Sequence, residues 1–185
     1  MILKIYIILF SLSLFIKDAD KYCQVFWDQR CKLQFSDFII VENEDSWIIE
    51  AKSAIGVSFN PRVVGDNKVE LKVRTSFDKC ESYMKGALDS VLLEHENIHF
   101  HIAEVYARKI RKCFQDIDCL TSNGAYEMYR LYLDSLDMVH DIYDDETVKG
   151  MNVEAQKKWG EKVQEQLFML KDYAEPVFIV KECEK

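Results

Sequence analysis

The sequence predicts an α+β domain, with a small N-terminal antiparallel sheet followed by helices. Two patterns carry this prediction. Between residues 32 and 75, β-branched and aromatic residues mix with polar ones and are broken by turn residues, which is typical of short strands. From residue 83 onwards, apolar residues recur at steps of three and four, the period of an amphipathic helix. The 185 residues suffice for one such domain with its own core and are too few for two.

The strands are expected on either side of a turn at "GDN" (65–67). Before this turn, the segment "DSWIIEAKSAIGVSFNP" is strand-like and is expected to stop at Asn60-Pro61. After it, the apolar residues at 69, 71 and 73 alternate with charged ones, as in a strand with one buried and one solvent-facing side. Together these segments predict the small sheet.

Three helices are expected after the sheet. The first ends near Lys112 in the basic run "ARKIRK", which suits the negative C-terminal end of a helix. The second covers about residues 125–144, after the loop "CFQDIDCLTSNG", and the third is the segment "NVEAQKKWGEKVQEQLFML" that follows Gly150. Residues 176–180 are a candidate terminal strand.

The charge of the chain excludes one class of partner. The formal net charge is −8 in a composition that is otherwise ordinary for a globular protein. A nucleic-acid partner is not expected, because a phosphate backbone requires a concentrated basic surface. The acidic balance is most simply a solubility feature.

The N-terminus has the features of an export signal. One lysine precedes an apolar run from Ile5 to Phe15 or Ile16, which is as long as a signal-peptide core and shorter than the about 20 residues that span a bilayer. We expect residues 1–22 to be a signal peptide, with an uncleaved anchor as the alternative, and residues 23–185 to form a single domain. That domain is expected in the periplasm or outside the cell, with no stable membrane insertion.

Export agrees with the cysteines, which number six and can form up to three disulfides in an oxidising compartment. A zinc site built from them is not expected, because no CxxC spacing is present. On spacing alone, the expected disulfides are Cys23–Cys31, Cys113–Cys119 and Cys80–Cys183.

The motif with the clearest chemistry lies on the first helix, in "LLEHENIHFHIAEVYARKIRK". His95 and His99 are four residues apart on its apolar stripe, so one metal ion can bind both rings. Glu96 is rotated by about 100° from His95 and can face a water on that metal. Zinc lowers the pKa of such a water to about 7, and Glu96 accepts its proton as the general base of amide hydrolysis. The alternative is a pair of buried histidines with no metal.

Two neighbouring residues on this helix are not expected to join the site. His101 is rotated well away from the histidine pair, which predicts a surface residue. Glu104 lies on nearly the opposite side of the helix from His95 and is expected to order a neighbouring strand or loop instead.

Several motifs of the chain resemble a bacterial family, the domain of unknown function 922 family. The segments that carry the resemblance are "FSDF" (35–38), "AKSAIGVSF" (51–59), "VRTSFDKCESYM" (73–84), the HExxH helix, and "YDDETVKG" (143–150) with the "NVEAQKKW" that follows it. Members of this family are described as secreted zinc-dependent proteases, so the resemblance implies a zincin-like fold and zinc as the cofactor. The family usually has Asp where this chain has His101.

The resemblance also raises the question of the third zinc ligand. The family typically has Tyr-Asp-x-x-Thr-x-His-Gly in the later segment, and its histidine, a natural third ligand, falls on Lys149 here. A catalytic zinc usually has three protein ligands and a water, and a lysine is a poor ligand. The candidates on the same stretch are Asp144, which we favour because it matches the family's aspartate, then Glu146, then His140.

The aromatic residues near the second helix suggest one further role. Tyr143 lies beside the candidate ligands and is the best candidate to donate a hydrogen bond to the oxyanion of a tetrahedral intermediate, although most of the tyrosines here are expected to pack against the first helix. Trp47 and Trp159 are interpreted as core residues.

These features lead to three functional hypotheses. The first is a secreted zinc metallopeptidase acting on a peptide or protein substrate, with Glu96 as base and His95, His99 and Asp144 as ligands. The second, motivated by Lys149, is an exported binding or structural protein that keeps the fold without catalysis. The third is a disulfide-stapled domain whose histidines only pack.

Overall fold

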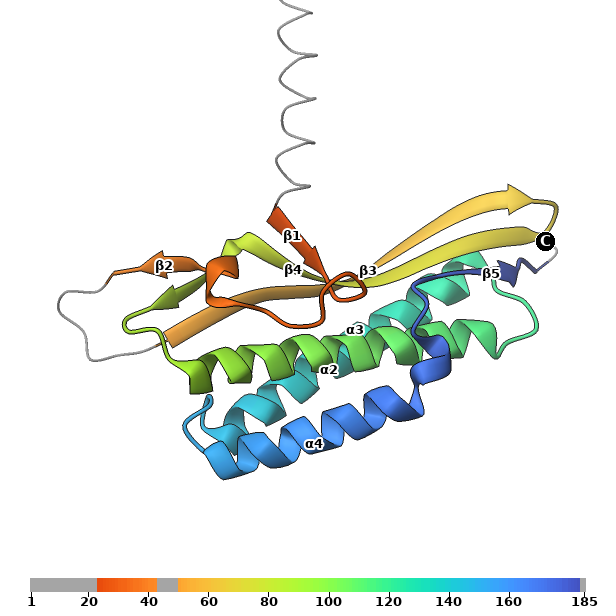
Figure 1. The fold of residues 1–185 in the computed structure, drawn as a ribbon. Helices are drawn as coiled ribbons and strands as arrows, with labels where there is room; N and C mark the ends of the chain where they lie inside the picture. The colour runs from red at the N-terminus through yellow and green to blue at the C-terminus, as the bar shows by residue number, and fades with distance from the viewer. Residues whose placement is uncertain (1–22, 43–49, 184–185) are drawn as a thin grey trace, which may run out of the picture.

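Three long helices lie on one side of a sheet in this protein (Figure 1). The structure is a computed structural model that describes residues 23–42 and 50–183. Its α+β class confirms the sequence prediction. The predicted signal peptide (1–22) and Trp47 lie outside the described residues. Within the described ranges, no helix has both the length and the apolar character needed to cross a membrane.

The sheet has five strands, and its centre is one long strand, β4. The strands are β1 (Gln24–Phe26), β2 (Ile39–Val41), β3 (Glu50–Gly65), β4 (Lys68–Lys85) and β5 (Val177–Lys181). On one side β4 pairs along almost its whole length with β3, antiparallel. On its other side it pairs in turn with β5 (antiparallel), β1 (antiparallel) and β2 (parallel). β5 confirms the candidate terminal strand.

The hairpin of β3 and β4 turns where the sequence predicted. Gly65 pairs with Lys68, and Asn67 has a φ of 53°, a conformation that asparagine tolerates well. The expected end of the strand at Asn60-Pro61 is wrong, because β3 continues to Gly65, with Pro61 opposite Leu71. Among the described strands β3 pairs only with β4, and a proline is tolerated on such an edge strand.

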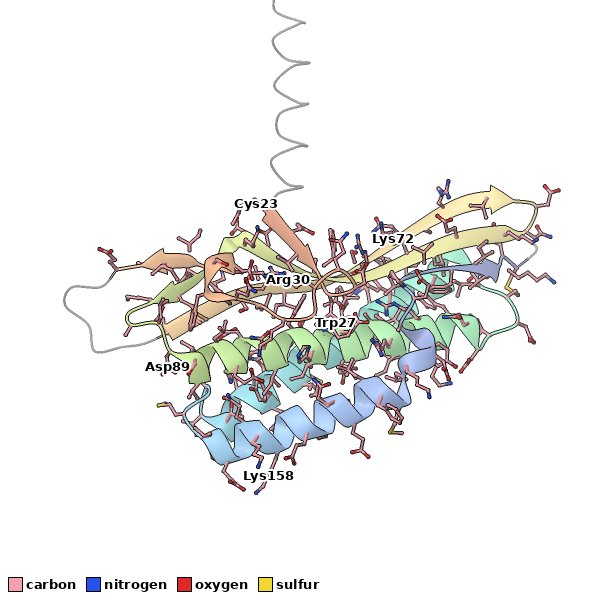
Figure 2. All side chains as sticks on the ribbon, viewed as in Figure 1. Cys23, Trp27, Arg30, Lys72, Asp89 and Lys158 are labelled. Atoms are coloured by element: carbon pink, nitrogen blue, oxygen red, sulfur yellow. A yellow bond between two sulfur atoms is a disulfide. The ribbon has the colours of Figure 1, made fainter. Side chains whose placement is uncertain are left out.

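The helices are α2 (Ser90–Gln115), α3 (Ser122–Thr147) and α4 (Val153–Met169). Each begins at a side chain that accepts a hydrogen bond from the first turn, namely Asp89, Thr121 and Asn152 respectively, the usual N-cap arrangement. α2 lies against the sheet, and α3 and α4 pack on α2 (Figure 1). Figure 2 shows Asp89 at the start of α2.

The apolar side of α2 forms the main core with the sheet and the other helices. Ile98, Ile102 and Ile110 are almost fully buried there, together with Val73 of β4 and Val163 of α4. Trp159 on α4 is 9% exposed and belongs to this core, as expected. Two short 3-10 helices, η1 (Phe35–Asp37) and η2 (Lys171–Tyr173), connect the longer elements.

The structure contains two disulfides, and the pairing expected from spacing is wrong. The bonds are Cys23–Cys80 and Cys119–Cys183, whereas Cys31 and Cys113 are free thiols. The sheet decides the pairing. β1 lies antiparallel to β4, so Cys23 falls beside Cys80, and the bridge between Leu120 and Glu182 brings the second pair together.

Candidate metal centre

Three ligand atoms from two helices converge at one point between α2 and α3. The Nε2 atoms of His95 and His99 are 3.1 Å apart. Oδ1 of Asp144 lies 3.0 Å from the first nitrogen and 2.9 Å from the second. α2 supplies the two histidines one turn apart, and α3 supplies the carboxylate near its C-terminal end. Asp144, the favoured candidate, is therefore the side chain that completes the group.

This triangle has the dimensions and the chemistry of a divalent metal site. Two imidazoles and one carboxylate form a ligand set that is common for catalytic zinc. Bonds of about 2.0–2.1 Å in a tetrahedral arrangement separate the ligand atoms by about 3.3 Å, close to the distances found between the three atoms. The donor set therefore fits zinc.

The environment keeps the Asp144 carboxylate ionised. Burial opposes its ionisation, but hydrogen bonds and electrostatic interactions with His95 and His99 outweigh the burial, so the pKa of Asp144 lies well below its usual range. An ionised carboxylate is the form that binds a cation. The side chain of Asp144 is 36% exposed, whereas those of His95 and His99 are 3% and 11% exposed.

The ring of Tyr143 packs against the imidazoles of both His95 and His99. It stacks on His95 at 4.6 Å between centroids and meets the edge of His99 at 4.7 Å. The tyrosine is fully buried, and its hydroxyl lies 3.5 Å from the backbone oxygen of His95. Burial raises the pKa of Tyr143, as do the charges of Glu96 and Asp144. This placement indicates a positioning role, because the hydroxyl faces backbone and the residue does not line the cavity described below.

The other two third-ligand candidates have different partners. Nδ1 of His140 lies 2.8 Å from Nδ1 of His99, on the side of that ring away from Asp144. Glu146 accepts a hydrogen bond of 2.7 Å from the indole nitrogen of Trp159. His140 is thus a neighbour of a ligand, and Glu146 orients a core tryptophan.

His140 lies where it can accept a hydrogen bond from the candidate ligand His99. Burial and the nearby charge of His99 lower the pKa of His140 to about 3, although Asp144 acts in the other direction, so His140 is neutral at neutral pH. If His99 binds a metal through Nε2, its Nδ1 carries the proton and donates to the lone pair on His140 Nδ1. Such outer partners fix the tautomer and orientation of a metal-binding histidine.

A second polar side chain lies near His95, on the other side of Gly150. Within the described part of the chain, His95 Nδ1 and Gln156 Oε1 are buried without hydrogen-bond partners. Both side chains lie beside Gly150, where an added Cβ would come within 3.2 Å of His95 Cγ and 3.4 Å of Gln156 Oε1. If His95 binds a metal through Nε2, its Nδ1 atom carries the proton and is a hydrogen-bond donor. The Oε1 atom of Gln156 is an acceptor. Gly150 therefore packs closely on both side chains, and its φ of 88° is one that residues with a Cβ rarely adopt.

Glu96 faces the cavity and has no internal partner. It is 5% exposed, and no group in the described ranges forms a hydrogen bond with its carboxylate. The residue is largely buried, but it lines the cavity, so its carboxylate can interact with a ligand or with water there. The position of Glu96 is the one that the HExxH spacing predicts for a general base.

The ligand triangle opens into a cavity of about 730 Å³, a size typical of small-ligand and peptide sites. Its walls come from three parts of the chain: the N-terminal part of β3, the first turns of α2, and the end of α3 with the turn that follows. The lining includes Glu50, Lys52, Glu96, Asp144, Lys149 and Met151. The histidines are therefore not enclosed in hydrocarbon.

Two sequence predictions about α2 have opposite outcomes. Glu104 does order a strand, because its carboxylate accepts a hydrogen bond of 2.9 Å from Thr75 of β4. The predicted exposure of His101 is wrong: Trp27 Nε1 donates to its Nδ1 at 3.0 Å, and the segment that carries Trp27 crosses α2 at this point (Figure 2). Helix rotation alone does not reveal a segment that covers the second face.

The sequence prediction did not include the contributions of Gln156, Lys149 and Met151 to this region. From the sequence, Lys149 is only a residue that stands where a zinc ligand is expected. In the structure it lines the cavity together with His95, His99 and Asp144. Its place five residues after Asp144 was the available signal. No protein-family model, no curated protein and no solved structure matches this chain.

Proposed function

We propose that this protein is an exported zinc-dependent peptidase. The single observation that carries the proposal is the convergence of His95, His99 and Asp144 next to the unpartnered carboxylate of Glu96, at the base of an open cavity. The resemblance to the domain of unknown function 922 family supports the same activity. The signal-like N-terminus and the two disulfides support export.

The residues divide the work as follows. The chemistry that zinc supplies in such a ligand set is a lower pKa for water, about 7, and polarisation of a substrate carbonyl. The Glu96 carboxylate takes the proton of the attacking water and delivers it to the leaving amine nitrogen, so that it ends each cycle ionised. Tyr143 and His140 hold the two imidazoles in register. Water, carbonyl and carboxylate are thus aligned before the reaction begins.

The cavity suits an extended peptide. One wall is β3, whose outer edge pairs with no other described strand. Free backbone groups on a sheet edge can pair with a peptide in the extended conformation, which gives affinity independent of sequence. An edge strand beside a metal centre therefore favours a peptide bond as the group that is hydrolysed.

The second candidate is an exported binding protein that keeps this fold without catalysis. It was motivated by Lys149 in the place of the family's histidine. This motive is weaker now, since Asp144 supplies a third donor atom without Lys149. The two candidates differ in turnover, which the following experiment measures.

The test combines metal analysis with hydrolysis of a peptide library. The wild type is expected to bind about one zinc per chain and to cleave peptides, and Asp144→Asn is expected to lose most of the zinc because it removes a ligand. Glu96→Gln is expected to keep the zinc and to lower kcat/KM by about 10²–10⁴-fold, the usual contribution of a general base.

The chain offers a matched control for each variant. Asp145→Asn and Glu94→Gln change the neighbouring carboxylates, which are exposed, and both are expected to behave as the wild type. Full activity in Glu96→Gln would refute the assigned base. Zinc binding without hydrolysis of any peptide would favour the binding protein. No zinc binding at all would favour the third hypothesis, a disulfide-bonded domain whose histidines only pack.

A further inference from the structure

We propose that Lys52 and Lys149 form a recognition site for a carboxylate of the substrate, so that the protein selects acidic peptides. This inference rests on the proposed function, because it names the substrate class of the same cavity. It is carried by the position of the two ammonium groups, by their lack of partners and by the local balance of charge.

The two lysines reach the cavity from different elements. Lys52 belongs to β3 and Lys149 to the turn between α3 and α4. Both side chains are exposed, whereas Glu96 is 5% exposed. The lysines therefore lie at the rim of the cavity, where they meet parts of a substrate away from the reacting bond.

The turn that carries Lys149 is held in an unusual conformation. Val148, Lys149 and Gly150 all have positive φ, at 50°, 52° and 88°. Such a conformation is rare for non-glycine residues and most of all for a β-branched one, and it clusters at functional sites.

Local contacts tie this turn to the ligand triangle. The amide of Lys149 donates to the backbone oxygen of Asp144 at 2.8 Å. Gly150 packs so closely on His95 that an added Cβ would come within 3.2 Å of its ring. The position of Lys149 is therefore fixed relative to two of the metal ligands.

Both ammonium groups are available to a ligand. Neither lysine forms a hydrogen bond or an ion pair with any residue in the described ranges. By contrast, the cavity residue Glu50 already accepts a hydrogen bond from the hydroxyl of Tyr83. An unpaired lysine on an open surface is common, but here two such lysines from different elements line the same cavity.

The charge of the cavity differs in sign from that of the whole chain. The chain has a net charge of −8, which repels acidic peptides at long range. Inside the cavity, a divalent cation offsets Glu96 and Asp144, and the two lysines then outnumber the one remaining acid, Glu50. An acidic substrate is thus attracted only at the site, and a basic one is repelled there.

The test uses peptide binding to the zinc-loaded Glu96→Gln protein, which does not consume its ligand. The probes are rhodamine-labelled peptide libraries that differ only in a fixed internal Asp or Asn, each with a free or an amidated C-terminus. Fluorescence anisotropy measures the affinities. A preference for internal Asp identifies a side-chain carboxylate as the ligand, and a preference for the free C-terminus identifies the terminal carboxylate.

We expect one of the two acidic probe types to bind more tightly than its neutral partner. Each of Lys52→Met and Lys149→Met is expected to reduce this preference about threefold, the size of one exposed ion pair. The double variant is expected to abolish it, and raised salt to weaken it. Lys157→Met removes an exposed lysine of α4 outside the cavity and is expected to retain the preference.

The outcomes separate this inference from the proposed function. Equal binding of acidic and neutral probes, or a preference that survives in the double variant, would overturn the recognition site even if the wild type cleaves peptides. A preference that depends on the lysines in a protein that cleaves nothing would support the site and refute the peptidase. Thermal unfolding of each variant, expected to match the parent protein, shows that the exposed substitutions leave the fold intact.

Discussion

The two halves of α2 bury polar side chains in opposite ways. In the C-terminal half, the Glu104 carboxylate accepts hydrogen bonds from Arg108 and Arg111 at 3.0 and 2.8 Å. In the N-terminal half, His95, Glu96 and His99 direct their polar atoms towards Asp144 and the cavity. Both halves carry charged or ionisable groups that are almost fully buried, so burial alone does not separate them.

The difference lies in whether the polar atoms satisfy one another. The buried guanidinium groups of Arg108 and Arg111 also donate to the backbone oxygens of Leu167 and Val73, so the C-terminal half is a closed network that joins α2 to α4 and β4. In the N-terminal half, and among the described residues, the Nδ1 atom of His95 and the carboxylate of Glu96 lack partners. A closed network stabilises the fold, whereas open valences indicate a ligand.

The largest effect is expected from a variant that disrupts the closed network in the C-terminal half of α2. Glu104→Gln removes the carboxylate that pairs, within the described part of the chain, with two buried guanidinium groups, and an uncompensated buried charge typically costs about 3–5 kcal/mol of the free energy of unfolding. Urea denaturation of the metal-free protein measures this loss. The zinc affinity of the folded fraction is expected to stay unchanged, since Glu104 contributes no atom to the ligand triangle.

The matched control is Glu154→Gln on the outer face of α4. Glu154 forms an exposed ion pair of 3.4 Å with Lys158, which Figure 2 shows on the side of α4 away from the sheet. Removing it is expected to change the free energy of unfolding by less than about 0.5 kcal/mol. An equally small change in Glu104→Gln would mean that the closed network does not stabilise the protein.

The next effect concerns the N-terminal half of α2, and it is measured as zinc affinity and not as stability. His140→Leu removes the acceptor for Nδ1 of His99, and the loss of such an outer partner typically weakens metal binding about 10–100-fold. Competition with a chromogenic chelator measures the zinc affinity. His140→Asn keeps an acceptor at a similar position and is expected to retain much of that affinity, which separates hydrogen bonding from packing.

Asp141 supplies the control for the His140 variants. It is exposed and adjacent to His140, and Asp141→Asn is expected to bind zinc as the wild type does. If His140→Leu and the wild type have the same zinc affinity, the contact between the two imidazoles does not support the metal site.

The sequence was informative where one element determines the outcome. The HExxH spacing predicts the pair His95 and His99 because both lie on one helix, and the period of a helix is known in advance. The "GDN" turn and the alternation after it likewise predict the hairpin of β3 and β4. The carboxylate that joins the two histidines is less local, since three candidates lie within two turns of α3, and only the packing of α3 on α2 places Asp144 beside them.

The sequence was misleading where distant elements meet. A short spacing favours local disulfides, but Cys23 bonds to Cys80 because two strands pair, and Cys119 bonds to Cys183 because the loop after α2 forms a bridge with the C-terminal segment. Pro61 suggested the end of a strand, whereas β3 is an edge strand that tolerates it. No pattern within any one of these segments contains that information.

The smallest effect lies between the two halves of α2, at His101. Burial, with a smaller contribution from the charge of Lys32, lowers the pKa of His101 to about 4, and the Nδ1 lone pair that accepts from Trp27 is lost on protonation. The ordinary pKa of histidine is about 6.5, so the unfolded chain binds the proton more readily than the folded one. Stability contributed by neutral His101 is therefore present above pH 6.5 and falls as the pH drops towards 4.

The variant that isolates this contribution is His101→Gln, which keeps an acceptor for Trp27 and does not titrate. Urea denaturation of the metal-free protein at pH 5 and pH 7 is expected to show that the wild type loses about 2 kcal/mol more than the variant over this interval. Because all other groups titrate in both proteins, the difference belongs to His101. Parallel pH profiles would mean that His101 is accessible to protons in the folded protein, as its place on the helix alone suggested.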